Sequence, residues 1–163
     1  MKRVLTILTI SLILAAVQSC GFHLRGKVQL SSKVSPVYVK SSDASFAGIM
    51  QEQLSSSGNA PAGSSDGAAT VLRITNIKYN RIVRTVDTRG KVTGYVLNYE
   101  LNFNVTDKGG NKLLADQRVQ KQRDYNFDST QVLAKESEET YLRQDMEKAA
   151  ALQIIRQLAA ISR

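Results

Sequence analysis

The sequence is poor in the residues that build metal centres and covalent cross-links. Its 163 residues include one cysteine and one histidine. An intramolecular disulfide and a zinc site made of Cys and His are therefore excluded, and a metal site would have to consist of carboxylates alone. P-loop, GxGxxG and HExxH motifs are also absent. The length suits a single domain, and a hydrophobic content of 42% is enough for a core.

Catalytic side chains are scarce in the same way. The only thiol is Cys20 and the only imidazole is His23, close beside it, so neither a Ser/His/Asp triad nor a Cys/His pair can be assembled. Asp87, Asp107 and Asp116 are dispersed through predicted turns and a strand, where solvated carboxylates are common. We therefore predict a protein that is not an enzyme and that has no cofactor.

The N-terminus predicts export and a lipid anchor. Lys2 and Arg3 precede an apolar run over residues 4–17, which is too short to span a membrane and is typical of a secretory signal. The run leads into VQSC at 17–20, which resembles the bacterial lipobox and implies cleavage before Cys20 and acylation of that cysteine. Two or three acyl chains would anchor the protein firmly, at about 0.8 kcal/mol per buried methylene. The alternative is an ordinary secreted protein with a free thiol.

An excess of basic residues predicts an anionic partner. Lysine and arginine number 22 against 14 acidic residues, a formal net charge of +8. The export signal disfavours nucleic acid and leaves lipopolysaccharide, whose phosphates can be bound by a few basic side chains. The alternative is a solvated sheet surface, since basic residues commonly protect β edges. The first predicted hairpin carries a cluster of them: Lys78, Arg81, Arg84, Arg89 and Lys91.

Hydrophobic periodicity predicts six elements. A short strand at 36–40 is followed by a helix capped by Ser42 or Asp43 that ends near residues 57–58. Strands at 71–86 and 94–105 and an edge strand at 112–126 form a meander, with a bulge near Thr75 and Asn76. A long helix with acidic residues near its start, including Glu139, completes the chain. We predict an α+β two-layer sandwich, β-α-β-β-β-α, with both helices on one face of a mostly antiparallel sheet of about four strands.

The domain division follows from these elements. Residues 1–19 are the predicted lipoprotein signal peptide, residues 20–35 a lipidated lead segment, and residues 36–163 a single α+β domain. Gly21 follows the predicted lipidated cysteine where an Asp would retain a lipoprotein at the inner membrane. We therefore expect sorting to the outer membrane of a Gram-negative cell.

Three sequence pieces in order resemble one family. The sequence resembles the lipopolysaccharide-assembly lipoproteins, LptE or rare lipoprotein B, in three places: CGFHLRG at 20–26, the Arg89–Gly90 hairpin, and QVLAK at 131–135. The last of these is followed by acidic residues and a long helix. The resemblance implies a lipoprotein that sits largely inside the lumen of the LptD-type outer-membrane β-barrel, aids the folding of that barrel, and binds lipopolysaccharide. Arg89 and Lys135 occupy the positions that the family ties to lipopolysaccharide binding, and Lys91 is a neighbour.

Two functional hypotheses remain open from the sequence. The first is a subunit of the lipopolysaccharide-assembly translocon that plugs the barrel one-to-one, assists its assembly and is anchored in the inner leaflet of the outer membrane on the periplasmic side. The outward face with Asn98, Asn102 and Asn104 suits a polar lumen. The alternative is a free periplasm-facing lipid-binding or carrier lipoprotein, which would need an apolar cavity that ten aromatic residues and two core-filling helices hardly provide.

Overall fold

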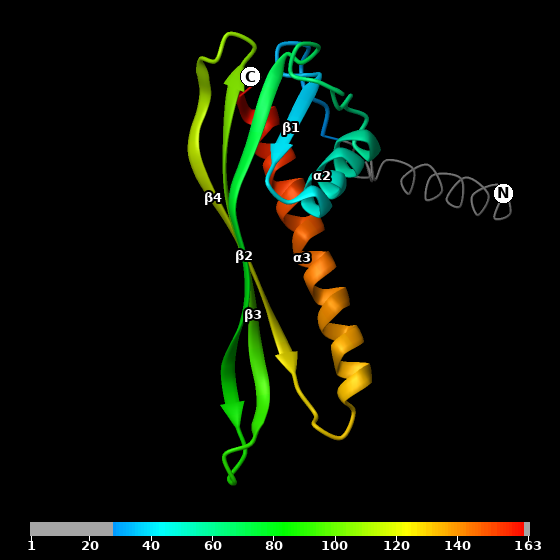
Figure 1. The fold of residues 1–163 in the computed structure, drawn as a ribbon, viewed down its shortest axis with the longest axis vertical. Helices are drawn as coiled ribbons and strands as arrows, with labels where there is room; N and C mark the ends of the chain where they lie inside the picture. The colour runs from blue at the N-terminus through cyan, green and yellow to red at the C-terminus, as the bar shows by residue number, and fades with distance from the viewer. Residues whose placement is uncertain (1–27, 162–163) are drawn as a thin grey trace, which may run out of the picture.

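The computed structural model describes residues 28–161, and these form one twisted sheet with two helices on one face (Figure 1). Cys20 and the predicted signal segment lie outside the described residues, as do positions 162 and 163. The elements in chain order are β1 (Val37–Ser41), α2 (Ala44–Ser56), β2 (Thr70–Val86), β3 (Val92–Asp107), β4 (Lys112–Asn126) and α3 (Val132–Ile161). The predicted fold class and element order are confirmed.

The sheet has the spatial order β1-β2-β3-β4. β1 pairs parallel to β2, and the other neighbours are antiparallel. The two hairpin turns depend on glycines in the left-handed region, with φ of 78° at Gly90 and 83° at Gly110. Each turn is closed by an aspartate: Asp87 accepts hydrogen bonds from the Arg89 and Lys91 backbone amides, and Asp107 accepts one from the Asn111 amide.

A bulge reverses the buried face of β2, as the sequence predicts. The pairing of β2 with β3 shifts between Thr75 and Lys78, and Asn76 has a φ of 52°. Ile74 before the shift is buried, and Tyr79 after it packs against the same core. The bulge thus lets one long strand keep facing α3 along the strongly twisted sheet.

The core lies between the sheet and the two helices. Asp43 caps α2 by accepting a hydrogen bond from the Phe46 amide at 3.1 Å. α2 contacts β1 and α3, while α3 contacts β3 and β4. The strict alternation of β3 places its apolar residues in the core, as predicted. The largest fully buried side chains are Tyr99, Tyr125, Phe46, Phe103, Met50, Leu54, Leu72, Ile74, Leu97, Leu101, Met146 and Ile154.

Residues 28–35 have no helix or strand, yet they pack against the domain. Val34 is buried in the core, and its carbonyl accepts a hydrogen bond from Thr70 Oγ1 at 2.8 Å. The Asn59 side chain donates to the Val28 carbonyl and accepts from the Leu30 amide, both at 2.7 Å. The last part of the predicted lead segment therefore enters β1 in close contact with the domain.

The molecule is elongated, and its two ends differ (Figure 1). At one end lie β1, the β3–β4 turn and the C-terminal part of α3, with α2 beside them. At the other end lie the β2–β3 turn and the start of α3, and only α3 covers the sheet there. We call this second end, comprising residues 82–93 and 127–135, the distal end.

Candidate functional site at the distal end

The distal end carries all three residues predicted to bind lipopolysaccharide. Arg89 and Lys91 lie on the β2–β3 turn, and Lys135 lies in the first turn of α3. β4 ends beside the base of this hairpin, since Asn126 pairs with Gly94 and the Phe127 amide donates to the Thr93 carbonyl. The structure thus brings the three residues to one end of the molecule, on two separate elements (Figure 1). Within residues 28–161, no hydrogen bond joins Lys135 to the turn.

The turn presents its basic side chains to solvent. The Arg89 side chain is 76% exposed, and its nearest acidic group is Asp87, 3.3 Å away. Hydrogen bonds from the Lys91 and Arg89 backbone amides, together with one from the Arg89 side chain, hold the pKa of Asp87 below its ordinary value. The Asp87 carboxylate is therefore charged at neutral pH and fixes the turn. The Arg89 guanidinium is exposed, so replacing its ion pair with Asp87 by a pair with another anion costs little free energy.

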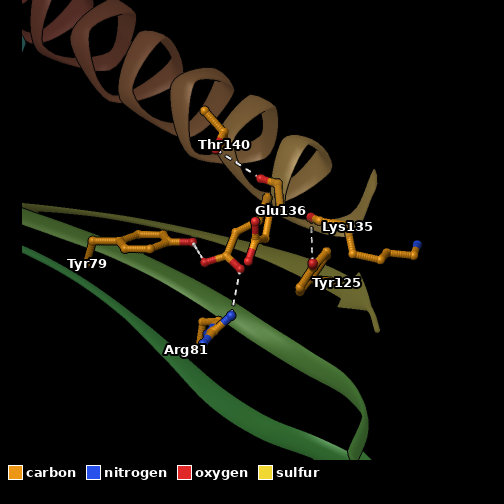
Figure 2. Close-up of polar contacts among 7 residues, drawn as sticks. Tyr79, Arg81, Tyr125, Lys135, Glu136 and Thr140 are labelled. Carbon is orange, nitrogen blue, oxygen red and sulfur yellow. Dashed lines mark hydrogen bonds and ion pairs between the residues drawn. The ribbon is translucent and has the colours of Figure 1, made fainter. Parts of the chain in front are cut away.

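Lys135 is more constrained than the turn residues. Its Nζ is 2.7 Å from Glu138 Oε2 and 6.0 Å from the centre of the Tyr125 ring. Its carbonyl accepts a hydrogen bond from the Tyr125 hydroxyl at 2.6 Å, which ties the start of α3 to the end of β4. Figure 2 shows this bond and the Lys135 side chain extending away from the neighbouring polar network. An anion at this position would compete with Glu138 for the ammonium group.

A network of polar side chains that the sequence analysis did not predict holds α3 on the distal part of the sheet. Glu139 accepts hydrogen bonds from the Tyr79 hydroxyl at 2.7 Å and from Arg81 at 2.9 Å (Figure 2). Burial and the bond to Glu139 raise the pKa of Tyr79 well above its ordinary value. The sequence assigned Glu139 only to the helix dipole. The sequence pattern that could have indicated its contact with β2 is the spacing of Tyr79 and Arg81, two residues apart on one strand, which places both side chains on the face toward α3.

Aromatic side chains form the floor beneath the start of α3. Tyr95, Tyr125 and Phe127 contact one another with ring centres 5.7 to 6.3 Å apart. Arg81 lies over the Tyr95 ring at 5.1 Å. This cluster fixes the position of Lys135 relative to the hairpin, because its three rings come from β3, β4 and the connection that follows β4.

Exposed apolar side chains lie at the same end of the molecule as the basic residues. Ile82, Val83 and Val86 on β2 are each at least half exposed, and Leu133 at the start of α3 is 80% exposed. The sequence pattern could not identify these residues. Which side chains stay exposed depends on the bulge that reverses the buried face of β2 and on how far β2 extends beyond the helices. The distal end therefore combines cationic groups with apolar surface, the two features that an amphiphilic anion requires.

The opposite face of the sheet is polar, as predicted. Side-chain hydrogen bonds cross three strands there, from Gln120 to Asn98 at 2.9 Å and from Asn98 to Asn80 at 3.3 Å. Asn104 donates to Asp116 at 2.7 Å, and Glu100 pairs with Arg118. This face offers many hydrogen-bonding groups to an aqueous or polar partner surface.

Two further observations bear on what the described residues can do. Among residues 28–161, no three His, Cys, Asp or Glu side chains gather where they could hold a metal ion. Neither helix of that part of the chain combines the length and the apolar character needed to cross a membrane.

Together these features define a class: a two-layer α+β protein with a polar sheet face and a basic, partly apolar hairpin end. The chain belongs to the family described as LptE, Lipopolysaccharide-assembly, whose model matches residues 34–158. It is 27% identical over 161 residues to an LPS-assembly lipoprotein LptE of Photorhabdus laumondii subsp. laumondii, covering 98% of this chain and 87% of that one. The family predicted from the three sequence pieces is confirmed.

Solved structures show the same fold. The solution structure of a lipoprotein B from Nitrosomonas europaea matches with a TM-score of 0.73 at 24% identity, over 86% of this chain and 91% of that one. The crystal structure of the rare lipoprotein B from Shewanella oneidensis matches with a TM-score of 0.65 at 25% identity, over 76% and 93%.

Proposed function

We propose that this protein is a non-catalytic, lipid-anchored subunit of the lipopolysaccharide-assembly machinery in the outer membrane. In this proposal the signal over residues 1–19 is removed, Cys20 carries the acyl chains, and the domain occupies the lumen of an LptD-type β-barrel with one copy per barrel. Membership of the LptE family supports the pathway. The polar face that carries Asn98 and Asn104 supports a wet lumenal contact.

The distal end is the proposed lipopolysaccharide-binding site, with Arg89, Lys91 and Lys135 as the cationic contacts. The observation that carries this proposal is the presence of exposed apolar side chains such as Val86 and Leu133 at the same end as these cations. Phosphates of lipid A can pair with the guanidinium and ammonium groups, and the acyl region can cover the apolar side chains.

The carrier alternative receives less support from the structure. A surface hollow of about 470 Å³ lies between α2 and α3, but Ile49 is the only apolar residue in its lining, which includes Arg143, Glu147 and Lys148. A site that carries an acyl chain through water needs a mostly apolar enclosure. The space between the helices and the sheet is filled by the fully buried core side chains.

Charge reversal at two positions tests the binding site. Arg89→Glu with Lys135→Glu in the mature protein should weaken lipopolysaccharide binding at least tenfold, since hydrogen bonds to charged groups each contribute about 1.5–3 kcal/mol. The matched control is Lys108→Glu with Lys112→Glu, which makes the same change in net charge at the β3–β4 turn at the other end (Figure 1). Equal weakening in the control, or unchanged binding in the distal variant, would refute the assignment.

A pull-down tests the barrel partnership separately. The mature lipidated protein, isolated from solubilised outer membrane, should bring an LptD-type barrel in a one-to-one ratio, and mass spectrometry should find Cys20 acylated. Stoichiometric lipid without a barrel would instead favour the carrier.

A further inference from the structure

One edge of the sheet is left without a neighbour over the distal half of β2. β1 pairs only with Thr70–Ile74 of β2, over the register Val37↔Thr70 to Ser41↔Ile74. β2 continues to Val86 with β3 on its other side. Among the described residues, no strand lies against residues 75–86 on the side that β1 has left, and Figure 1 shows this stretch as the free outer edge of the distal sheet. A free edge exposes backbone amide and carbonyl groups that can pair with another strand.

This edge differs from the other edge of the same sheet. The exposed side chains of β4 between Asp116 and Asp124 are all polar or charged, which is a common protection of an edge strand. On distal β2, in contrast, Ile82, Val83 and Val86 are 50–56% exposed. One edge therefore has the composition of a surface that stays in water, whereas the other keeps apolar side chains that a partner could bury.

A hollow marks the place where a new strand could begin. Where β1 separates from β2, a surface hollow of about 390 Å³ is lined by residues that include Lys40, Arg73 and the bulged Asn76. The hollow lies between the end of β1 and the start of the free edge of β2. A strand that pairs with β2 beyond the end of β1 would therefore begin beside the basic side chains of Lys40 and Arg73.

Charge decides which kind of strand fits the free edge. Between residues 78 and 91 the chain carries five basic side chains, of which Arg81, Arg84 and Arg89 are paired with the carboxylates of Glu139, Asp124 and Asp87. Within the described part of the chain, the charges of Lys78 and Lys91 remain uncompensated. The Lys78 side chain forms no hydrogen bond or ion pair with another residue of the range 28–161, so its charge is available. Two copies of this edge would bring like charges together, which disfavours self-pairing. The favourable occupant carries carboxylates.

The geometry points to strand addition: the edge of β2 over residues 75–86 receives an extended, carboxylate-bearing segment of the barrel partner, which becomes an additional strand beside β2. Main-chain hydrogen bonds supply the affinity, apolar side chains of the segment cover Ile82 or Val83, and its carboxylates face Lys78 and the basic hollow. This inference rests on the proposed function for the identity of the partner.

Hydrogen exchange measures the backbone pairing directly. Mature protein alone is compared with mature protein in the complex purified from outer membrane. Backbone amides over residues 75–86 should exchange at least tenfold more slowly in the complex, because half of the amides on an edge strand gain an acceptor when a strand is added. The β3–β4 turn at residues 107–112 is the internal control and should change less. Equal exchange of residues 75–86 in the two samples would overturn the inference.

Cross-linking identifies the occupant. A photo-reactive amino acid replaces Ile82 in the full chain, and the same residue replaces Leu113 as a control on exposed apolar surface at the other end. Capture of a barrel segment rich in Asp or Glu from position 82, and not from 113, supports the inference. Capture of a second copy of this chain, of lipid alone, or of a basic segment overturns it. If the barrel co-purifies without that cross-link, only the strand addition fails; if no barrel co-purifies, the proposed function fails too.

Discussion

The Tyr79–Glu139 hydrogen bond should contribute measurably to stability, and Tyr79→Phe isolates it. The phenol hydroxyl donates to Glu139 Oε1 at 2.7 Å, and the Glu139 side chain is only 17% exposed. A hydrogen bond to a charged group contributes about 1.5–3 kcal/mol. In Tyr79→Phe, Arg81 still pairs with the other oxygen of the Glu139 carboxylate at 2.9 Å, and water can bind the oxygen that loses the phenol. The loss of stability should therefore lie toward the lower end of that range. We expect the free energy of unfolding to fall by about 1–2 kcal/mol.

The matched control is the same substitution at an exposed position of the same helix. Tyr141 is 73% exposed, so Tyr141→Phe should change stability by less than about 0.5 kcal/mol. Urea unfolding of the mature protein, followed by circular dichroism, measures both variants. If Tyr79→Phe costs no more than Tyr141→Phe, the hydrogen bond does not hold α3 on the distal sheet and the reasoning fails.

The pH dependence of the same pair provides a second measurement. Because the folded state raises the pKa of Tyr79, the resulting stability is present below the unfolded value of about 10 and is lost as the pH rises further. The decline in stability above pH 10 should therefore be shallower in Tyr79→Phe than in the parent protein. Tyr99, whose pKa is also raised by burial, is present in both and cannot produce the difference.

Three other outcomes can be measured on the same protein. The carboxyl group of Asp87 should titrate below about 3.9 in carbon-detected NMR, so the order of its turn is kept above that pH and lost as the pH falls through the lowered folded pKa; titration at or above 3.9 would contradict the turn geometry. Asn59→Ala should destabilise the protein by about 1–3 kcal/mol and speed hydrogen exchange of the Leu30 amide, and unchanged exchange there would contradict the contact. Met146→Ala, at a fully buried position of α3, should cost about 2–5 kcal/mol in urea unfolding, and a value below 1 kcal/mol would contradict its place in the core.

Periodicity predicted most of the fold because most elements alternate or repeat cleanly. The alternating apolar residues of β3 are buried as expected, and the change of parity near Asn76 marked the bulge before any register was known. The packing of residues 28–35 left no such signal. Val34 is buried and Asn59 binds the backbone of the segment, but both contacts join positions far apart in the sequence and have no period.

The candidate site was predictable in its residue types and not in its geometry. The basic residues of the hairpin and of the start of α3 were evident from sequence, and both sets lie at the distal end (Figure 1). That Lys135 is paired with Glu138 while Arg89 stays largely exposed depends on side-chain placement. The free edge of β2 could not be foreseen either, because it follows from where β1 ends in the register.

The division of the molecule into two ends also explains why the distal end can carry charged and apolar side chains without destabilising the fold. Both helices cover the sheet only in the other half (Figure 1), and core residues on them such as Met50 of α2 and Ile154 of α3 are fully buried. The distal half is held instead by the Glu139 network, by the aromatic cluster and by the bond from Tyr125 to the start of α3. Solvent-exposed residues outside those contacts contribute little to the free energy of unfolding. Substitutions at Arg89 or Ile82 should therefore change binding while leaving stability nearly constant, whereas a change at Glu139 alters both by moving the helix that carries Lys135.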